Sequence, residues 1–170
     1  MYILETDRLR LRTITPEDAA FYLELVNDPA FIEHIGDRGI RTLDEAHEAV
    51  VDGPMAMHEE LGHSLYVVER KEDLALMGMS GLIKRETLED VDIGYAFLPA
   101  YRGHGYAFEA GQALLAYAPT LGITRVVAIT SPNNVASNQL LLKLGLKFQN
   151  FIHLTPEDAG TNLYLIDLTV

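Results

Sequence analysis

The sequence predicts an α/β fold of the α+β kind, in which helices flank one mixed β-sheet. Three observations lead to this class. Short apolar runs bounded by turn residues indicate strands, and capping residues followed by apolar side chains at helical spacing indicate helices. Their order is one strand, two helices, three strands, a helix, a strand, a helix and two strands, which fits a single sheet. The 170 residues have the length of one compact domain, so we expect one domain over residues 1–170.

The first expected strand covers residues 8–14. Leu9 and Leu11 alternate there with three arginines, so the arginines share one face of the strand. Such a row is more typical of a solvated or salt-bridged surface than of a ligand site.

Two helices are expected next. Thr15 and Pro16, followed by two acidic residues, have the pattern of an N-cap, a first helical residue and a negatively charged first turn. Asp28, which precedes a proline, ends that helix. The sequence TLDE at 42–45 is a capping-box pattern that begins the second helix. The segment 31–41 between them is expected to be a short helix or a loop.

Three strands are expected in the middle of the chain, over residues 64–70, 74–84 and 91–98. The second of these contains Gly78 and Gly81. Glycine inside a strand often marks a bulge or a close approach of another backbone, so we expect one of these features there.

Helices and strands alternate in the C-terminal part. Apolar and mostly small side chains recur at helical spacing from Ala107 to Ala118, which predicts a helix that lies close to the sheet. Residues 125–130 form a continuous apolar run, as in a buried strand. A further helix around residues 137–144 is closed by Gly145. Two last strands are expected near residues 146–153 and 162–169.

The segment Tyr101–Ala107 is the most informative part of the chain. Gly103 and Gly105 allow close approach of the backbone to a ligand, and the first turn of the following helix presents unpaired N–H groups. Together they predict an anion site, most often for phosphate. The residues do not match a P-loop, which needs Lys-Ser/Thr after its second glycine, or a dinucleotide turn, which needs three glycines. On the pattern alone, a tight strand-to-helix turn stays open as the alternative.

Composition excludes several classes of function. The net charge of −12 argues against nucleic-acid binding and favours cationic partners such as amines, although solubility alone also explains it. The absence of cysteine excludes disulfides, cysteine-based zinc sites and a cysteine nucleophile. No apolar run could span a membrane, and the N-terminus lacks the pattern of a signal peptide. We therefore expect a cytoplasmic protein without a membrane partner.

Four segments stand out together: ETDRLRLR at 5–12, DIGY at 92–95, YRGHGYAFEA at 101–110, and Asn134-x-x-Ser137 followed by KLGLKF at 143–148. In this order and spacing they resemble the GCN5-related N-acetyltransferase (GNAT) superfamily, and within it the RimJ/RimL-like type that acetylates ribosomal-protein N-termini. The resemblance covers nearly the whole chain. It implies a mixed, mostly antiparallel central sheet of about six or seven strands with about four flanking helices. It also implies acetyl-CoA as acyl donor.

The resemblance further implies where acetyl-CoA binds. Main-chain N–H groups of the glycine turn would hold its pyrophosphate, which fixed amides and a helix N-terminus stabilise without a metal. Main-chain groups of Phe97 and Leu98 would pair with the pantetheine arm as with an added strand. Asn134 and Ser137 would face the arm near the thioester. The implied binding residues in the turn are Arg102, Gly103, His104, Gly105, Tyr106 and Ala107.

Two residues are implied in catalysis. Asp92 lies where relatives place a carboxylate that accepts the proton of the amine, and since it is shorter than Glu it would act through a water. Ser137 would stabilise the leaving thiolate, because Leu141 stands where many relatives have a tyrosine acid. From the residues alone, two alternatives stay open: Asp92 could anchor a turn, and Ser137 could bond its own helix backbone.

The acceptor is expected to be an amine: a protein or peptide α-amino group, a polyamine or an aminoglycoside-like compound. His34 lies where relatives form the acceptor pocket and is the implied substrate contact, with a surface role as the alternative. Glu109 is expected to form a structural ion pair or to bind the loop. Tyr95 and Tyr106 are expected to pack with their hydroxyls in water.

No metal is expected, and a homodimer is an expectation of the resemblance alone. A non-catalytic acyl-CoA-binding or interaction module on the same fold is the alternative function. Another nucleotide-phosphate binder is disfavoured, because the chain lacks the Lys-Ser/Thr pair and a carboxylate cluster for a metal.

Overall fold

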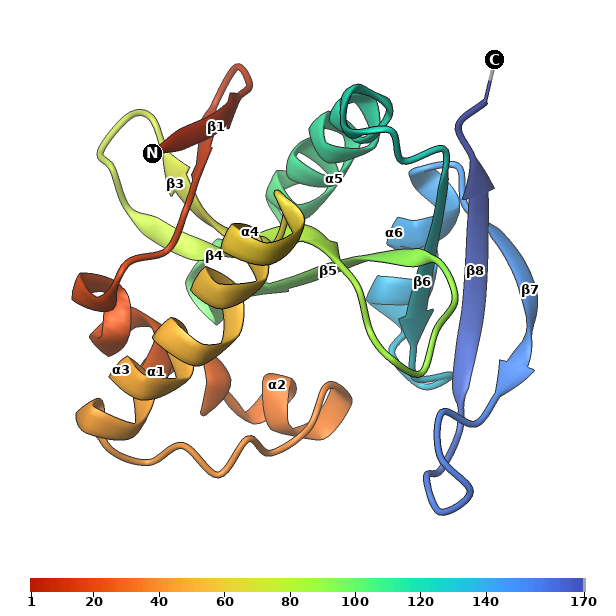
Figure 1. Cartoon of the computed structure of the whole chain (residues 1–170), viewed down its shortest axis with the longest axis horizontal. Helices are drawn as coiled ribbons and strands as arrows, with labels where there is room; N and C mark the ends of the chain where they lie inside the picture. Colours follow the sequence, from red (N-terminus) through yellow and green to blue (C-terminus); the bar gives the residue numbers. More distant parts are fainter. Residues whose placement is uncertain (170) are drawn as a thin grey trace.

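A computed structural model describes residues 1–169 of the chain. Within these residues, eight strands form one sheet in the order β1-β2-β3-β4-β5-β6-β8-β7 (Figure 1). Neighbouring strands are antiparallel except β5 and β6, which are parallel. The mixed, mostly antiparallel sheet is thus confirmed, with slightly more strands than expected. The strands are β1 (Tyr2–Glu5), β2 (Leu9–Arg12), β3 (Leu65–Arg70), β4 (Leu76–Ile83), β5 (Val91–Phe97), β6 (Arg125–Thr130), β7 (Lys147–Ile152) and β8 (Thr161–Asp167).

The helices follow the expected order. Short 3₁₀ turns lead into α1, separate β5 from α5 and follow α5. The segment 31–41 contains the end of a short helix, α2, followed by a loop. The α-helices are α1 (Ala19–Val26), α2 (Pro29–His34), α3 (Leu43–Val50), α4 (Ala56–Leu61), α5 (Tyr106–Tyr117) and α6 (Val135–Lys143).

Two elements were not expected. The strand β1 precedes the expected first strand, residues 8–14: it ends at Glu5, and a turn closed by the Thr6 N–H and the Leu9 carbonyl (2.9 Å) leads into β2. The second expected helix is also longer than expected, because a capping box indicates where a helix begins and not where it ends. After α3 it passes through a π-helical turn, Val51–Met55, and continues as α4. That turn contains Pro54, which lacks an N–H group and so cannot make a regular helical bond.

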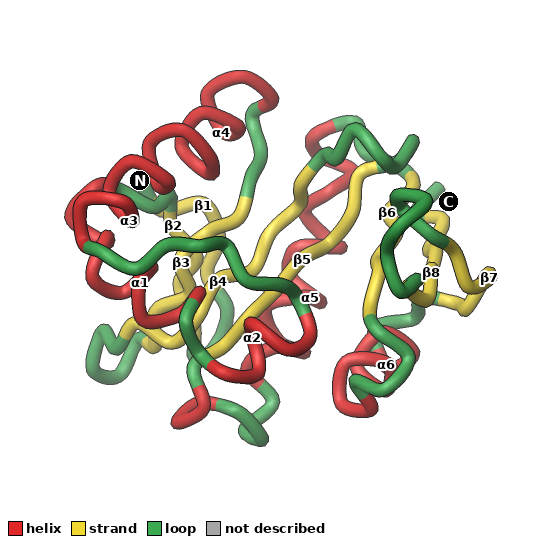
Figure 2. Tube along the Cα trace, turned by 90° about the horizontal axis from the view of Figure 1, so that it is seen from below, coloured by secondary structure: helices red, strands yellow, loops and turns green. Residues whose placement is uncertain are grey.

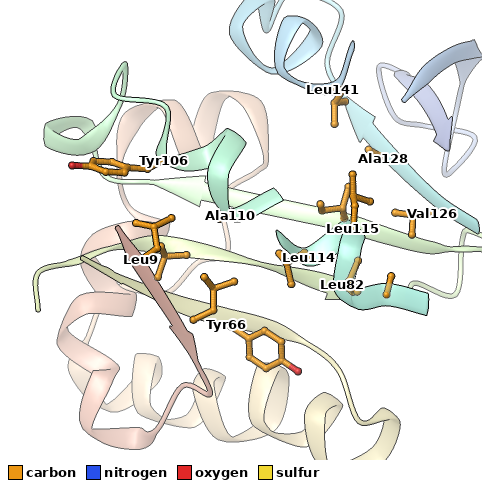
Figure 3. Packing of buried hydrophobic residues seen from close by; sticks show 14 of the residues in the cluster. Leu9, Tyr66, Leu82, Tyr106, Ala110, Leu114, Leu115, Val126, Ala128 and Leu141 are labelled. Carbon is orange, nitrogen blue, oxygen red and sulfur yellow. The ribbon is translucent and has the colours of Figure 1, made fainter. Parts of the chain in front are cut away.

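The sheet separates two hydrophobic layers. Alternate residues of one strand belong to different layers, as Val67 and Val68 of β3 do. The larger layer lies under α5 and includes Leu114 of that helix (Figure 3). The smaller layer lies under α1 and α3 and includes Leu25 and Val50. The strands β3 to β5 therefore carry hydrophobic layers on both faces of the sheet.

The two glycines of β4 allow close backbone approach. A Cβ at Gly81 would lie 2.0 Å from the Ser64 carbonyl oxygen, and one at Gly78 would lie 2.3 Å from the Ala96 carbonyl oxygen. The register with β3 also shifts next to Gly78. Both features expected from these glycines are therefore present.

The sheet opens between β5 and β6. These strands pair only through Val91 with Val126 and Asp92 with Val127, and no pairing between them follows Asp92 within the described residues. Figure 2 shows β6, β8 and β7 as a group set apart from the rest of the sheet. The part of β5 beyond Asp92 therefore has one edge without a neighbouring strand.

Candidate active site

A cavity of about 530 Å³ lies at this opening. It is lined by β5, the glycine turn, the first turns of α5 and α6, and α1 and α2 on the other side of the sheet. Among residues 1–169, no group of three or more His, Asp and Glu side chains is placed to hold a metal ion. Of the catalytic, cofactor-binding and substrate residues expected from the sequence, those that line the cavity are His34, Asp92, Phe97, Arg102, Gly103, Gly105, Tyr106, Ala107, Asn134 and Ser137.

Leu98 and His104 are the two that do not line it. Leu98 is buried in the smaller hydrophobic layer, and its N–H donates to the Met77 carbonyl at 2.9 Å. His104 is exposed, and its carbonyl accepts a hydrogen bond from Arg8 Nη1 at 3.0 Å.

The open edge of β5 offers main-chain groups to the cavity. Because the Leu98 N–H points to β4, the alternation of an antiparallel ladder turns the N–H and C=O groups of Ile93, Tyr95 and Phe97 toward β6. The Phe97 carbonyl already accepts from Arg102 Nε at 3.0 Å. The groups left for a ligand are therefore mainly those of Tyr95 and the Phe97 N–H.

The glycine turn presents a set of unpaired amides. Gly103 and Gly105 have φ values of +79° and +80°, which an L side chain rarely adopts. Within residues 1–169, the N–H groups of residues 103–108 donate no hydrogen bond to the protein. They lie at the start of α5, a helix of 12 residues, where the helix dipole adds a partial positive charge. The turn is thus built to accept an anion.

Arg8 and Glu109 fix the turn to the sheet. Glu109 accepts from Arg8 Nε at 2.7 Å and from the Arg8 N–H at 3.0 Å, and it also bonds the Thr6 hydroxyl. The Arg8 guanidinium lies 4.5 Å from the centre of the Tyr106 ring. The expectation of a structural ion pair for Glu109 is confirmed. The expectation that Arg8 belongs to a solvated or salt-bridged surface is confirmed by this ion pair, but no feature of the sequence indicated its bond to the turn.

Asp92 is almost fully buried, at 1% exposure, and borders the cavity. Its Oδ2 accepts from Arg85 Nε at 3.1 Å, while Oδ1 has no hydrogen-bond partner among the described residues. Burial raises the pKa of this carboxyl, and the nearby Arg85 partly opposes the rise. A buried carboxylate oxygen without a partner costs free energy, which a proton or a bound ligand could recover.

Ser137 is bonded to a residue that the sequence did not single out for catalysis. Its Oγ lies 2.6 Å from the hydroxyl of Tyr95, and either atom can be the donor. Burial raises the pKa of Tyr95 to about 12, so its hydroxyl keeps its proton at neutral pH. We expected the Tyr95 hydroxyl to lie in water, but it is instead bonded to Ser137. One feature of the sequence hinted at a role for Tyr95 in the site: it belongs to the same expected strand as Asp92.

The first turn of α6 is held in place from two sides. Asn134 is its N-cap and accepts from the Ser137 N–H at 3.3 Å. Asn138 donates to the Asn134 carbonyl at 2.8 Å and accepts from Tyr164 of β8 at 2.5 Å. A Cβ at Gly111 of α5 would lie 3.0 Å from the end of the Leu144 side chain, so this glycine keeps the contact between α5 and the end of α6 close.

The second side of the cavity is formed by α2. Asp28 caps this helix by accepting from the Phe31 N–H at 3.3 Å, and it also bonds Arg102 of the glycine turn. At the end of α2, His34 Nδ1 lies 3.2 Å from Ser131 Oγ, which follows β6. The helix is therefore linked to both the turn and β6 across the cavity.

Comparison with known proteins agrees with this arrangement. The family model described as "Acetyltransferase (GNAT) domain" matches residues 8–147. The match covers most of the chain, and the chain therefore belongs to the GNAT family of acetyltransferases.

Individual relatives support the same assignment. An uncharacterized N-acetyltransferase of Bacillus subtilis, YoaA, is 29% identical over 170 residues, which cover 96% of each protein. A GNAT-family acetyltransferase structure from Bacillus anthracis superimposes with a TM-score of 0.80 at 23% identity, covering 99% of both chains. The RimL ribosomal L7/L12 α-N-protein acetyltransferase in complex with coenzyme A superimposes with a TM-score of 0.82 at 18% identity, covering 99% of this chain and 98% of that one. At such identities the two structures show a shared fold.

Proposed function

We propose that the protein transfers an acetyl group from acetyl-CoA to a primary amine by direct attack of the amine on the thioester. One observation carries the proposal. A set of unpaired amides, an open strand edge and a buried carboxylate with a free oxygen all border the same cavity. The first two suit the diphosphate and the amide-containing arm of coenzyme A. The third suits an amine that must lose a proton.

The pantetheine arm would add to the open edge of β5. Its amides would pair with the main-chain groups of Tyr95 and the Phe97 N–H, while the pyrophosphate would take the N–H groups of residues 103–108. Of the predicted turn residues, Arg102 would act through its position, because its side chain is bonded to Asp28 and the Phe97 carbonyl. RimL, which shares this fold, is in complex with coenzyme A, and this supports coenzyme A as the ligand.

Asp92 would accept the proton of the attacking amine, directly or through one water. As the nitrogen lone pair forms the new C–N bond, the C–S bond breaks and the proton leaves the nitrogen for Asp92 Oδ1. The raised pKa of this carboxyl makes it a stronger base than an ordinary aspartate. Arg85, 3.1 Å from Oδ2, fixes the carboxylate with Oδ1 free.

Ser137 and Tyr95 would stabilise the departing sulfur. If Tyr95 donates to Ser137, the Ser137 hydroxyl proton is free to point to the thiolate. Both hydroxyls keep their protons at neutral pH, so their role is hydrogen bonding, and the thiolate takes its final proton from solvent. This pair would replace the late-helix tyrosine of relatives, whose place is taken by the fully buried Leu141.

The test is release of coenzyme A from acetyl-CoA in the presence of an amine panel, followed with a thiol reagent. The chain has no cysteine, so the protein itself gives no background. We expect release that saturates with both substrates. If acetyl-CoA binds with a saturable signal and no amine gives release above hydrolysis, the proposal of catalysis is wrong. The buried Leu141 would then favour the alternative, a non-catalytic acyl-CoA-binding module.

A further inference from the structure

The cavity differs in charge from the rest of the molecule. The chain has 25 acidic side chains and 13 Lys and Arg. Among the described residues that line the cavity, however, Asp92 is the one acidic side chain. Three arginines line it: Arg38, Arg85 and Arg102. Inside a partly closed cavity, nearby charges influence ligand binding more strongly than distant surface charges, which salt screens. The inside of the cavity therefore favours an anion, although the net charge of −12 favours cations outside.

The three arginines are not equally available. Arg102 is bonded to Asp28, so its charge is balanced within the protein. Arg85 is also paired, through Nε with Asp92, but its side chain stays about one third exposed, at 34%. No hydrogen bond from its two Nη groups is formed to any of residues 1–169. Arginine can bind a carboxylate with two such groups at once.

Of the three arginines, Arg38 is the most available to a ligand. It is exposed, and it takes part in no ion pair among the described residues. Its guanidinium carbon lies 5.9 Å from the centre of the Phe31 ring, and its charge reaches Tyr22, lowering the pKa of that hydroxyl against the stronger effect of burial. Arg38 is thus placed on the α1–α2 side of the cavity, where Phe31 and His34 also lie.

We infer that the amine acceptor carries a carboxylate close to its amino group, and that Arg38 and Arg85 bind this carboxylate. This inference rests on the proposed function and names its acceptor class. The same positive charges disfavour a protonated amine beside them, so they help to supply the neutral form that attacks the thioester. A polyamine, with several positive charges, would be repelled.

The carboxylate can come from a free α-amino acid or from an acidic residue near a peptide N-terminus, and matched acceptor pairs distinguish the two. One arm compares serine with serinamide. The other compares two amidated tripeptides that differ only by aspartate or asparagine in the second position. Rates are compared at equal concentration of the unprotonated amine, and spermidine serves as the cationic acceptor. We expect kcat/KM to be about tenfold higher for the carboxylate member of at least one pair, as for a charge-assisted hydrogen bond.

The arginines are tested by the ratio of kcat/KM within that pair, which is insensitive to a general loss of activity. Arg38→Gln and Arg85→Gln should each reduce the ratio toward one. Arg10→Gln is the matched control: Arg10 of β2 pairs with Glu5 of β1 and does not line the cavity, so the ratio should be unchanged. A ratio near one in the wild-type protein, or one unaffected by both cavity variants, would overturn the inference while leaving acetyl transfer intact.

A binding measurement separates this inference from the proposed catalysis. Calorimetry with CoA-saturated protein compares the aspartate and asparagine tripeptides, and serine with serinamide, without any turnover. Tighter binding of a carboxylate member that is lost in Arg38→Gln supports the acceptor class even if no acetyl transfer is found. Equal binding within both pairs, together with no turnover, overturns both proposals.

Discussion

The two sides of the cavity are built in different ways. On the donor side, the groups that would meet acetyl-CoA belong to the main chain: the amides of residues 103–108 and the open edge of β5. On the acceptor side, the lining consists of side chains from α1, α2 and the loop that follows, such as Tyr22, Phe31 and Arg38. A main-chain site depends on a few glycines and on element order. A side-chain site can change residue by residue while the fold stays the same.

A buried carboxylate also joins the two sides. Asp28, 7% exposed, caps α2 on the acceptor side and bonds Arg102 on the donor side. The comparison therefore yields variants that should affect one side, both sides or only the reaction between them.

The largest effect is expected for the reaction itself. Asp92→Asn should lower kcat by about 10²–10⁴-fold, as for loss of a general base, and leave the affinity for acetyl-CoA unchanged. The limb of the pH–rate profile that reflects ionisation of Asp92 should also disappear. The control is Asp90→Asn, a neighbouring carboxyl paired with Arg125 at 3.7 Å. Steady-state kinetics across pH would contradict the assignment if the two variants behaved alike.

A variant of the glycine turn should affect the donor side alone. Gly105→Val places a branched side chain at a φ of +80° among the amides and should weaken CoA binding about 100-fold, equivalent to one or two lost charge-assisted bonds. Gly122→Val is a close control, since Gly122 has the same φ of +80° with no atom near its missing Cβ and lies outside the cavity. Both should lose similar stability in thermal melts. Calorimetry showing equal loss of CoA affinity would refute a special role for the turn.

The pair formed by Ser137 and Tyr95 should act on kcat and not on binding. Ser137→Ala and Tyr95→Phe should each lower kcat about tenfold, and the double variant should be little worse than either, because both remove the same hydrogen-bonded unit. Tyr117→Phe, on α5 outside the cavity, is the control for loss of a tyrosine hydroxyl. Additive losses in the double variant would show that the two hydroxyls act independently.

Asp28→Ala should disturb both sides, because it removes the cap of α2 and the partner of Arg102. We expect a loss of stability of about 1–3 kcal/mol and a rise of a few fold in the KM for both substrates. Thr42→Ala also removes a helix cap, at α3, where the Thr42 hydroxyl accepts from the Glu45 N–H at 3.1 Å. Chemical denaturation should show a stability loss in both. Kinetics should show raised KM values for Asp28→Ala only, and the opposite pattern would mean that Asp28 does not link the two sides.

The smallest effect concerns stability against pH. Burial raises the pKa of Asp92 above its ordinary value of 3.8, so the folded state holds this proton more tightly than the unfolded chain does. The free energy of unfolding of the wild-type protein therefore falls as the pH rises from 3.8 to the raised pKa of Asp92. Above that pKa, Asp92 causes no further loss. Relative to wild type, Asp92→Asn should gain stability over that window, by about 1.4 kcal/mol per pH unit of pKa rise, and then stay level. A flat difference in denaturation free energy across pH would contradict a raised pKa.

The sequence predicted the donor side better than the acceptor side, for the physical reason given above. The glycines at 103 and 105, the strand before them and the helix after them are local signals, and the structure has these elements at the predicted places. Local signals cannot show that Tyr95 reaches Ser137, which lies 42 residues away, or that Arg8 reaches the turn from β2. Such contacts depend on how the elements pack.

The net charge of the chain was the poorest guide to the charge inside the cavity. The net charge of −12 was expected to favour cationic partners, yet the acids lie mostly outside the cavity and three arginines border it. Composition counts side chains without placing them. The strand β1 was overlooked for a similar reason: its four residues lack alternation, and its pairing with β2 is what makes them a strand.

The parting of β5 and β6 has a consequence for solubility. An unpaired strand edge at the rim of a sheet invites pairing with another molecule and hence aggregation. Here the unsatisfied edge faces inward, between two strands of the same sheet. Such an opening suits an extended ligand without bulky side chains better than the strand of a second protein chain, which brings its own side chains and neighbours. The fold can thus keep an edge permanently open for recognition without exposing it to self-association.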